Sequence, residues 1–277
     1  MILKTKLQIP QVKPNTIKRE RLIGLLKDNI DKKLILINAG AGYGKTTLLA
    51  QFITQVEMPT VCYHLEAHDS ELTLFLSYLS TGLRKIYPRF GRRTRTILKT
   101  LAYPNGYTEM IIGTFINDFV ENISSELLIV LDDYHNIDPS RRIDEALNYL
   151  LNHAPRNLHL IIATRQKPNF IMANLKARNE LFELTDAALK FNRDEIYQLF
   201  KEIHDISLEQ DELRTLEEHS EGWITSLQLI LQASGSEIRE RIKSHLLLRR
   251  TLDINKWWSD YFNYFAQEIF AREPPHI

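Results

Sequence analysis

The chain has 277 residues, of which 44% are hydrophobic and 25% charged, a composition typical of a globular protein with one large core or two smaller ones. Lysine and arginine together number 35, as do aspartate and glutamate, so the net charge is zero, which argues against direct binding of nucleic acid by this chain. The single cysteine excludes an intrachain disulfide, and no apolar run approaches the roughly 18 residues of a membrane span, so we expect a cytoplasmic protein.

The first 190 residues alternate short apolar runs with helical patterns. The runs do not alternate cleanly between apolar and polar residues, which is typical of strands buried on both faces of a parallel sheet. This order predicts a doubly wound α/β fold. The expected strands lie at 34–37, 60–65, 127–131, 158–163 and, more weakly, 181–184, and the expected helices at 46–56, 72–86, 108–123 and 140–153.

Residues 191–277 show helical patterns only. Asn192 with Glu195, and Ser207 with Gln210, have the spacing of a helix N-cap and its reciprocal acid or amide. The helical patterns end near residues 203, 219, 233, 248 and 270. We therefore expect two domains, at 1–190 and 191–277.

The stretch KLILINAGAGYGKTT joins the first expected strand to the first expected helix through a glycine-rich loop. Glycines let backbone amides point into one concavity, and the helix N-terminus adds the positive end of its dipole, so the loop suits a phosphate group. Lys45 would reach the β- and γ-phosphates of ATP or ADP, and the hydroxyl of Thr46 would bind Mg²⁺. A glycine-rich turn without a ligand is the alternative, and the intact Gly-Lys-Thr argues against it. The predicted nucleotide-binding residues of the loop are Ala41, Gly42, Tyr43, Gly44, Lys45, Thr46 and Thr47.

Two acids follow the third expected strand, in LLIVLDDYH. Asp132 should lie at the carboxyl end of that strand, near the Mg²⁺ ion and its water ligands. Asp133 follows, where a second acid can orient or activate a water molecule, so we predict it as a catalytic residue together with Lys45. Alone, two such acids would more often form a helix cap or a turn, but the phosphate loop in the same chain favours the metal site.

The fourth expected strand ends in LHLIIATRQKP. In a sheet where this strand lies between the first and the third, Thr164 and Arg165 would come beside the γ-phosphate and could sense its presence. From the residues alone, an ordinary polar strand end is an equally good interpretation.

Other polar residues carry weaker signals. The basic stretch YPRFGRRTRTILK could bind nucleic acid or donate an arginine to a neighbouring subunit, but the neutral chain favours a solvated loop between two helices. His64, His68, His135 and His153 show no metal-ligand spacing, so we assign no metal site to them.

In this order, the phosphate loop, the acid pair and the strand ending in Thr164 resemble the nucleotide-binding module of the STAND signalling ATPases. More narrowly, they resemble the MalT-type branch of LuxR-family transcription regulators, and the resemblance covers nearly the whole chain. TKLQIPQVKP is similar to the N-terminal signature of that branch, AGAGYGKTT to its phosphate loop, VLDDYH to its Walker B segment and ATRQKP to its sensor segment. HSEGWITSLQL is similar to the signature of its helical domain, with Ser226 in place of a glycine.

The resemblance implies a P-loop NTPase of the ASCE type, an α/β domain at 1–190 with a parallel sheet flanked by helices, followed by an all-helical domain at 191–277. Residues 1–30 would contribute to the nucleotide site, where Arg19 would contact the base or the phosphates. The family places a winged-helix domain next, so the resemblance implies that the chain ends at the start of a missing one. Inducer and DNA contacts would belong to missing domains, and the full-length active state would self-associate.

Three functions follow from these observations. We expect a regulatory switch in which nucleotide exchange and slow ATP hydrolysis control inducer-dependent oligomerisation. A motor or processing ATPase of the AAA+ type, acting on a polymer, is the alternative, but we find no convincing pore loop. A small-molecule kinase is disfavoured because we recognise no lid for binding an acceptor.

Overall fold

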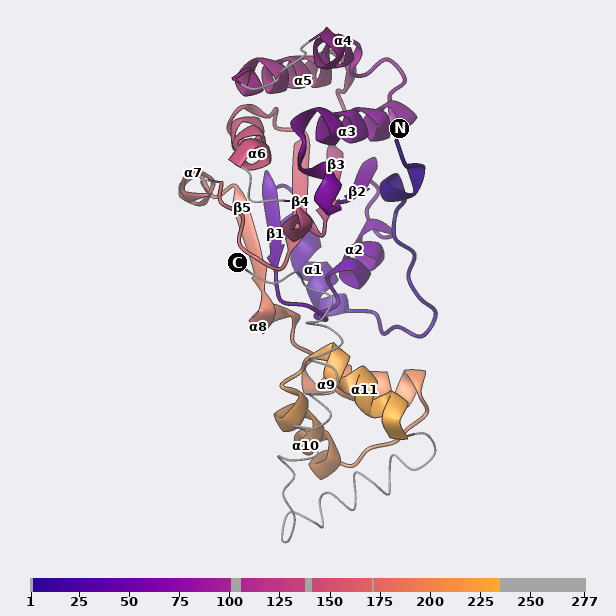
Figure 1. Ribbon diagram of the computed structural model, residues 1–277. Helices are drawn as coiled ribbons and strands as arrows, with labels where there is room; N and C mark the ends of the chain where they lie inside the picture. Colours follow the sequence, from indigo (N-terminus) through magenta and orange to yellow (C-terminus); the bar gives the residue numbers. More distant parts are fainter. Residues whose placement is uncertain (1, 101–105, 138–140, 171, 235–277) are drawn as a thin grey trace. The chain divides into compact units, whose positions relative to one another are not determined.

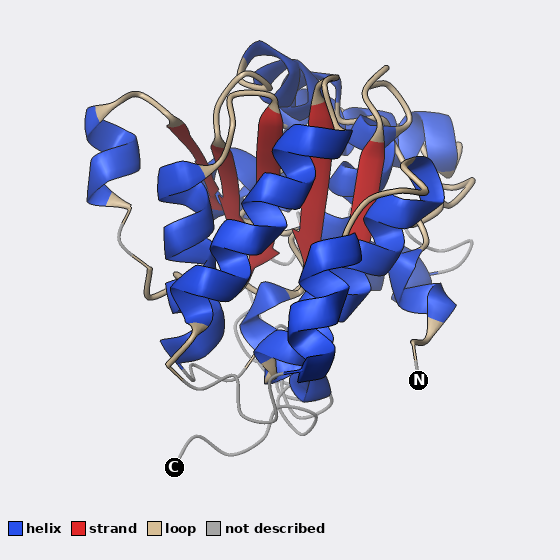
Figure 2. Cartoon of the chain, turned by 90° about the horizontal axis from the view of Figure 1, so that it is seen from above, coloured by secondary structure: helices blue, strands red, loops and turns tan. Residues whose placement is uncertain are grey.

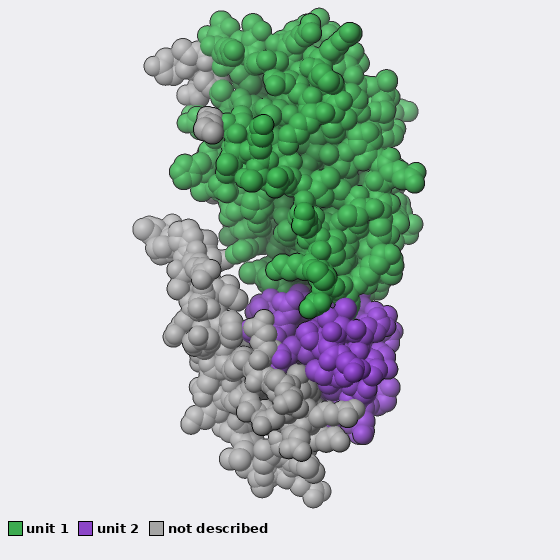
Figure 3. Space-filling view, turned by 90° about the vertical axis from the view of Figure 1, so that its right-hand side faces the viewer, with its two compact units in different colours: residues 1–190 green, residues 191–277 purple. Residues whose placement is uncertain are grey.

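The computed structural model describes residues 2–100, 106–137, 141–170 and 172–234, whose path Figure 1 shows. The chain divides into two compact units, unit 1 at residues 1–190 and unit 2 at 191–277, which Figure 3 colours separately. Among the helices in the described ranges, none combines the length and the apolar character needed to cross a membrane.

Unit 1 is built on a parallel sheet to which the described residues contribute five strands (Figure 2). Across the sheet the order is β2-β3-β4-β1-β5, so β4 lies between β1 and β3. This confirms the predicted fold class, a P-loop parallel sheet of the ASCE type flanked by helices. The strands are β1 (Leu34–Asn38), β2 (Thr60–His64), β3 (Leu127–Asp132), β4 (Leu158–Thr164) and β5 (Leu181–Thr185).

The inner strands are buried on both faces, and this explains why their sequences lack a polar alternation. Leu34 and Leu36 of β1 belong to one core cluster, whereas Ile35 and Ile37 belong to the other. Helices α1 (Glu20–Asp28) and α2 (Lys45–Ile53) supply the second cluster. The first cluster is supplied by α3 (Leu72–Ile86), α5 (Thr108–Asn122), α6 (Arg141–His153) and α7 (Ala173–Ala177).

Every expected strand and helix of unit 1 is present, and the largest difference lies at α2, which ends at Ile53 where the pattern extended to 56. Shorter elements that the patterns did not predict lie between them. These are η1 (Lys4–Leu7), η2 (Ala67–Ser70), η3 (Tyr134–Asn136) and α8 (Asp186–Leu189), and the patterns did not predict the helices α1 and α7 either.

The basic stretch after α3 is a helix, α4 (Arg92–Thr100), so the prediction of a solvated loop there was wrong. The helix is fixed at Thr94, which is fully buried and whose amide and hydroxyl both donate to Asp118 of α5, at 2.9 and 2.8 Å. Just before it, the buried ring of Phe90 meets Phe115 edge to face. These contacts hold one side of α4 against α5, while its basic residues Arg92, Arg93, Arg95 and Lys99 are exposed.

In its described part, unit 2 consists of helices and the turns and loops that connect them. It contains α9 (Arg193–Gln198), a turn of π-helix η4 (Leu199–Ile203), α10 (Gln210–Ser220) and α11 (Ile224–Ser234). The predicted capping pair is confirmed, because the amide of Glu195 donates to Asn192 at 2.8 Å and the amide of Asn192 to Glu195 at 3.1 Å. The helices expected to end near 248 and 270 lie outside the described residues.

The second capping prediction, at Ser207, was wrong. Helix α10 is capped two residues later by Glu209, whose amide donates to the buried carboxylate of Glu212 at 2.8 Å. A longer side chain here performs the role that the sequence signature gives to serine.

Candidate functional site

The carboxyl ends of the parallel strands bring the predicted site residues to one edge of the sheet. Asn38, the last residue of β1, pairs with Thr164 of β4, and His64 of β2 pairs with Asp132 of β3. The phosphate loop follows β1, and its Ala39 amide donates to the carbonyl of Thr164 at 3.1 Å. The segments predicted from the sequence therefore lie together.

In the loop between β1 and α2, the side chain of Lys45 folds back and donates hydrogen bonds to carbonyls of the loop itself. Gly42 and Gly44 have φ of 73° and 77°, a region that favours glycine because it has no Cβ. The side chain of Lys45 is buried and donates to the carbonyls of Ala39 and Gly40 at 2.6 and 2.8 Å. Burial lowers the pKa of Lys45. The ammonium group therefore lies inside the loop, where phosphate oxygens could replace the two carbonyls as its acceptors.

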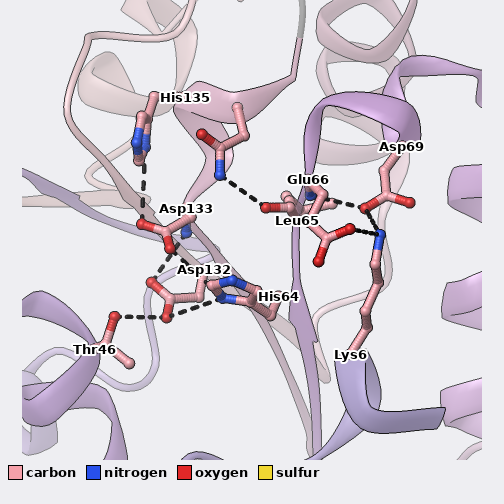
Figure 4. Close-up of polar contacts among 10 residues, drawn as sticks. Lys6, Thr46, His64, Leu65, Glu66, Asp69, Asp132, Asp133 and His135 are labelled. Atoms are coloured by element: carbon pink, nitrogen blue, oxygen red, sulfur yellow. Dashed lines mark hydrogen bonds and ion pairs between the residues drawn. The ribbon is translucent and has the colours of Figure 1, made fainter. Parts of the chain in front are cut away.

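Thr46 and Asp132 meet across the sheet edge. The Thr46 hydroxyl donates to Oδ2 of Asp132 at 2.8 Å, although the two residues are 86 positions apart (Figure 4). Asp132 is only 6% exposed. A hydroxyl and a carboxylate side by side are oxygen ligands of the kind that Mg²⁺ prefers, so the residues present fit such an ion.

Asp133 adopts a left-handed backbone conformation, with φ 54° and ψ 42°, and its amide donates to Oδ1 of Asp132 at 3.0 Å. Burial raises the pKa of Asp133, and the neighbouring charge of Asp132 raises it further. Two imidazoles flank its carboxylate: Nδ1 of His64 lies 3.6 Å from Oδ2, and Nδ1 of His135 lies 3.9 Å from Oδ1 (Figure 4). A carboxylate that holds its proton more tightly is a stronger base, as general base catalysis requires.

Of the two residues predicted to sense the γ-phosphate, Arg165, which follows β4, acts on the site through its charge. The positive charge of Arg165 adds to the effect of burial in lowering the pKa of Lys45, and it opposes the rise in the pKa of Asp133. Thr164 is fully buried, and its hydroxyl donates to the carbonyl of Gln166 at 2.7 Å, which shapes the turn after the strand. Sensing of a γ-phosphate by either residue stays a prediction.

Arg19 is buried at the start of α1, where its guanidinium donates to the carbonyls of Leu189 and Lys190 at 3.0 and 3.3 Å. These carbonyls lie at the end of α8, where a positive charge is favourable. Arg19 therefore joins the N-terminal lead-in to the end of unit 1, and its contact with a nucleotide stays a prediction.

Two residues of this edge were missed by sequence reasoning. Asp186 follows β5 directly, and its Oδ1 accepts the amide hydrogen of Gly40 in the phosphate loop at 2.9 Å. His64, to which we assigned no metal role, lies with its Nδ1 3.8 Å from Oδ2 of Asp132 (Figure 4), and contact with Asp132 raises the pKa of His64. A polar residue at the carboxyl end of a parallel strand was the available signal for both.

The chain is similar to known proteins along most of its length. The family described as "Nephrocystin 3, N-terminal" matches residues 16–165. The HTH-type transcriptional regulator MalT of Yersinia pestis is 35% identical over 236 residues, which are 84% of this chain and 25% of the regulator. MalT of Yersinia enterocolitica is 34% identical over 236 residues, which are again 84% of this chain and 25% of the regulator. These relatives confirm the predicted resemblance, and the chain spans about a quarter of the length of the curated relatives it matches.

Among solved structures, a STAND protein with a tetratricopeptide repeat sensor from Pyrococcus horikoshii is similar in fold, with a TM-score of 0.55. The match covers 87% of this chain and 33% of that one at 19% identity. It supports the fold assigned from the strand order.

Proposed function

The chain belongs to the nephrocystin 3 N-terminal family, and on that premise we propose that it is an ATP- or ADP-binding module whose bound nucleotide regulates a larger protein. The observation that carries the proposal is the hydrogen bond between Thr46 and Asp132, which joins the phosphate loop to the Walker B acid across β4. The similarity to transcriptional regulators named MalT supports a regulatory role rather than a metabolic one.

In the proposed site, Lys45 and the loop amides at 41–47 would hold the phosphates, and Thr46 with Asp132 would hold Mg²⁺. When bound, Mg²⁺ supplies positive charge that stabilises the phosphates of the transition state. Asp133 would orient a water molecule and accept its proton, which its raised pKa favours. Slow hydrolysis is the expected rate, because a signalling state must persist.

The proposed output is self-association of the whole protein, controlled by nucleotide exchange. Residues 191–277 would form its helical domain. Inducer and DNA contacts are proposed to belong to other parts of the whole protein.

The nucleotide content of the purified protein tests this proposal. The chain is purified without added nucleotide and denatured, and the released compounds are identified and counted by chromatography. We expect close to one ADP per chain, exchanging slowly with added ATP. The variant Lys45→Ala should release none, because its loop lacks the cation that pairs with the β-phosphate.

Lys27→Ala is the matched control, since Lys27 is an exposed lysine of α1 that donates to Gln55. It should retain the nucleotide of the natural chain. An empty site with rapid multiple turnover of added ATP would contradict the switch and favour the motor alternative. Nucleotide content that is equal in Lys45→Ala and the natural chain would contradict the site itself.

A further inference from the structure

Three potential metal ligands from two neighbouring strands converge beside the phosphate loop. His64, Asp132 and Asp133 each offer one ligand atom, and these atoms lie within 4.8 Å of one another. Parallel pairing of β2 with β3 sets His64 opposite Asp132, so the sheet itself determines this grouping. The sequence separates His64 from the two acids, and for that reason no metal-ligand spacing is visible.

The distances suit a common ion. Two ligands that each bind one divalent ion at about 2.1 Å lie roughly 3.0 to 4.2 Å apart in tetrahedral or octahedral geometry. Nδ1 of His64 lies 3.8 Å from Oδ2 of Asp132 and 3.6 Å from Oδ2 of Asp133, which is inside that range.

The type of ligand determines which ion the site prefers. Mg²⁺ takes oxygen ligands almost exclusively, whereas an imidazole nitrogen favours transition-metal ions. We propose that His64, Asp132 and Asp133 form a site for a divalent transition-metal ion, with His64 as the residue that makes it prefer such an ion to Mg²⁺. The inference rests on the proposed nucleotide site, because Asp132 and Asp133 belong to both sites.

The surroundings leave the proposed site accessible and joined to the phosphate loop. Oδ2 of Asp132 also accepts the hydroxyl hydrogen of Thr46, so an ion at His64 would lie next to the metal ligand of the loop. A cavity of about 790 Å³ is lined by Thr46, His64 and Asp132, and by residues 5–11 of the N-terminal segment. The side chain of His64 is 47% exposed, so an ion can reach its ring and a substitution there should be tolerated.

Metal selectivity of the full chain tests the proposal, with Mn²⁺ as the probe. Free Mn²⁺ is measured by electron paramagnetic resonance during titration, and Mg²⁺ affinity by displacement of the bound Mn²⁺. The decisive variant is His64→Asn, because the amide oxygen of asparagine can occupy nearly the place of Nδ1 and so exchanges a nitrogen ligand for an oxygen. We expect the preference for Mn²⁺ over Mg²⁺ to fall about tenfold in this variant.

Two further measurements separate ligation from a structural effect. In protein labelled with ¹⁵N and given unlabelled ADP, pulsed resonance should detect coupling of Mn²⁺ to a protein nitrogen, and this coupling should disappear in His64→Asn. His68→Ala is the matched control, since His68 is an exposed histidine of η2 outside the cluster, and its selectivity should equal that of the natural chain.

The result that would overturn the proposal is an unchanged Mn²⁺ to Mg²⁺ ratio in His64→Asn, or the lack of nitrogen coupling in the natural chain. Nucleotide content is measured on the same samples. Retained ADP with an unchanged ratio refutes the metal preference and leaves the nucleotide site standing. An altered ratio without any bound nucleotide supports the metal site and refutes the proposed function.

Discussion

Asp133 is the residue at which activity and stability are expected to conflict. Its folded pKa is raised above 3.8, so the folded state holds the proton more tightly than the unfolded chain does. The corresponding stability is present below pH 3.8 and is lost as the pH rises through the folded pKa. At neutral pH the ionised carboxylate therefore destabilises the fold.

We predict that Asp133→Asn unfolds at a higher temperature than the natural chain at pH 7, without nucleotide or metal. Asparagine cannot ionise, and the gain should be on the order of 1 kcal/mol, or about 2–4 °C in Tm. Thermal unfolding between pH 4 and 8 checks this, and the difference should shrink as the pH falls. A difference that is the same at every pH would show that burial of the charge is not the cause.

The same variant should slow ATP hydrolysis by about 10²- to 10⁴-fold, the usual contribution of a general base, while nucleotide remains bound. Single-turnover hydrolysis measured beside nucleotide content separates the two effects. If hydrolysis proceeds at the natural rate, Asp133 shapes the turn and does not act as the base. That outcome would favour the alternative interpretation of the sequence, in which the acid pair forms a helix cap or a turn.

Residues that follow a local pattern could be predicted, and residues placed by the sheet could not. Thr46 and Asp132 each belong to a short motif of consecutive residues. In the structure the hydroxyl of Thr46 lies 2.8 Å from Oδ2 of Asp132. His64 and Asp186 reach the same edge only because β2 pairs with β3 and β5 pairs with β1. Strand order and register are properties of the whole sheet, so the sequence offered only their positions at strand ends.

Helix α3 approaches β2 closely at Gly82, where a Cβ would lie 2.5 Å from Cγ1 of Val61. We predict that Gly82→Ala destabilises unit 1 by about 1–3 kcal/mol, because both elements are packed and one of them would have to shift. Denaturant unfolding measures the loss.

Gly113→Ala is the matched control, because Gly113 lies within α5 and a Cβ there meets nothing within 4 Å. Alanine in that helix should stabilise by about 0.5–1 kcal/mol. Equal effects at the two positions would show that helix propensity, and not the approach of α3 to β2, determines the result.

The N-terminal segment is held by a buried ion pair. Lys6 of η1 is 7% exposed and lies 2.8 Å from Asp69 and 2.9 Å from Glu66 (Figure 4), and its ammonium lies over the ring of Tyr78. Asp69 is fully buried, so removing the lysine leaves a carboxylate without its cation. We predict that Lys6→Met lowers the free energy of unfolding by about 3–5 kcal/mol.

Lys4→Met in the same short helix is the control, since Lys4 is exposed and its loss should change stability by less than about 0.5 kcal/mol. The double variant Lys6→Met, Asp69→Asn should recover part of the loss, because it removes the unpaired charge. Additive losses in the double variant would contradict this explanation.

Elements with a strong hydrophobic pattern were predicted well, and those fixed by tertiary contacts were not. The sequences of the inner strands are continuous apolar runs because a hydrophobic core cluster covers each face of the sheet. Helix α4 was predicted as a loop because all its basic residues are exposed and it is anchored by the contacts of Thr94 with Asp118. The N-cap of α10 was predicted two residues too early, because Glu209 performs the role expected of Ser207.

At the scale of the molecule, the candidate site residues from Arg19 to Asp186 lie within unit 1. The residues that end this unit still contribute to it, because Leu189 and Lys190 accept hydrogen bonds from Arg19 and β5 covers the edge of β1. The boundary at 190 therefore separates a part that should contain a complete nucleotide site from the remaining helices.

We predict that a fragment of residues 1–190 folds and binds nucleotide, whereas a fragment of residues 1–180 does not fold. The shorter fragment lacks β5, Asp186 and the acceptors of Arg19, and it exposes the unpaired edge of β1 to aggregation. At a hundredfold excess of Mg-ADP over its Kd, ligand binding adds about 2.7 kcal/mol to stability, which a thermal scan of the longer fragment should detect. If that fragment folds without responding to Mg-ADP while the full chain responds, unit 2 supplies part of the nucleotide site, and the division of roles between the two units proposed above is wrong.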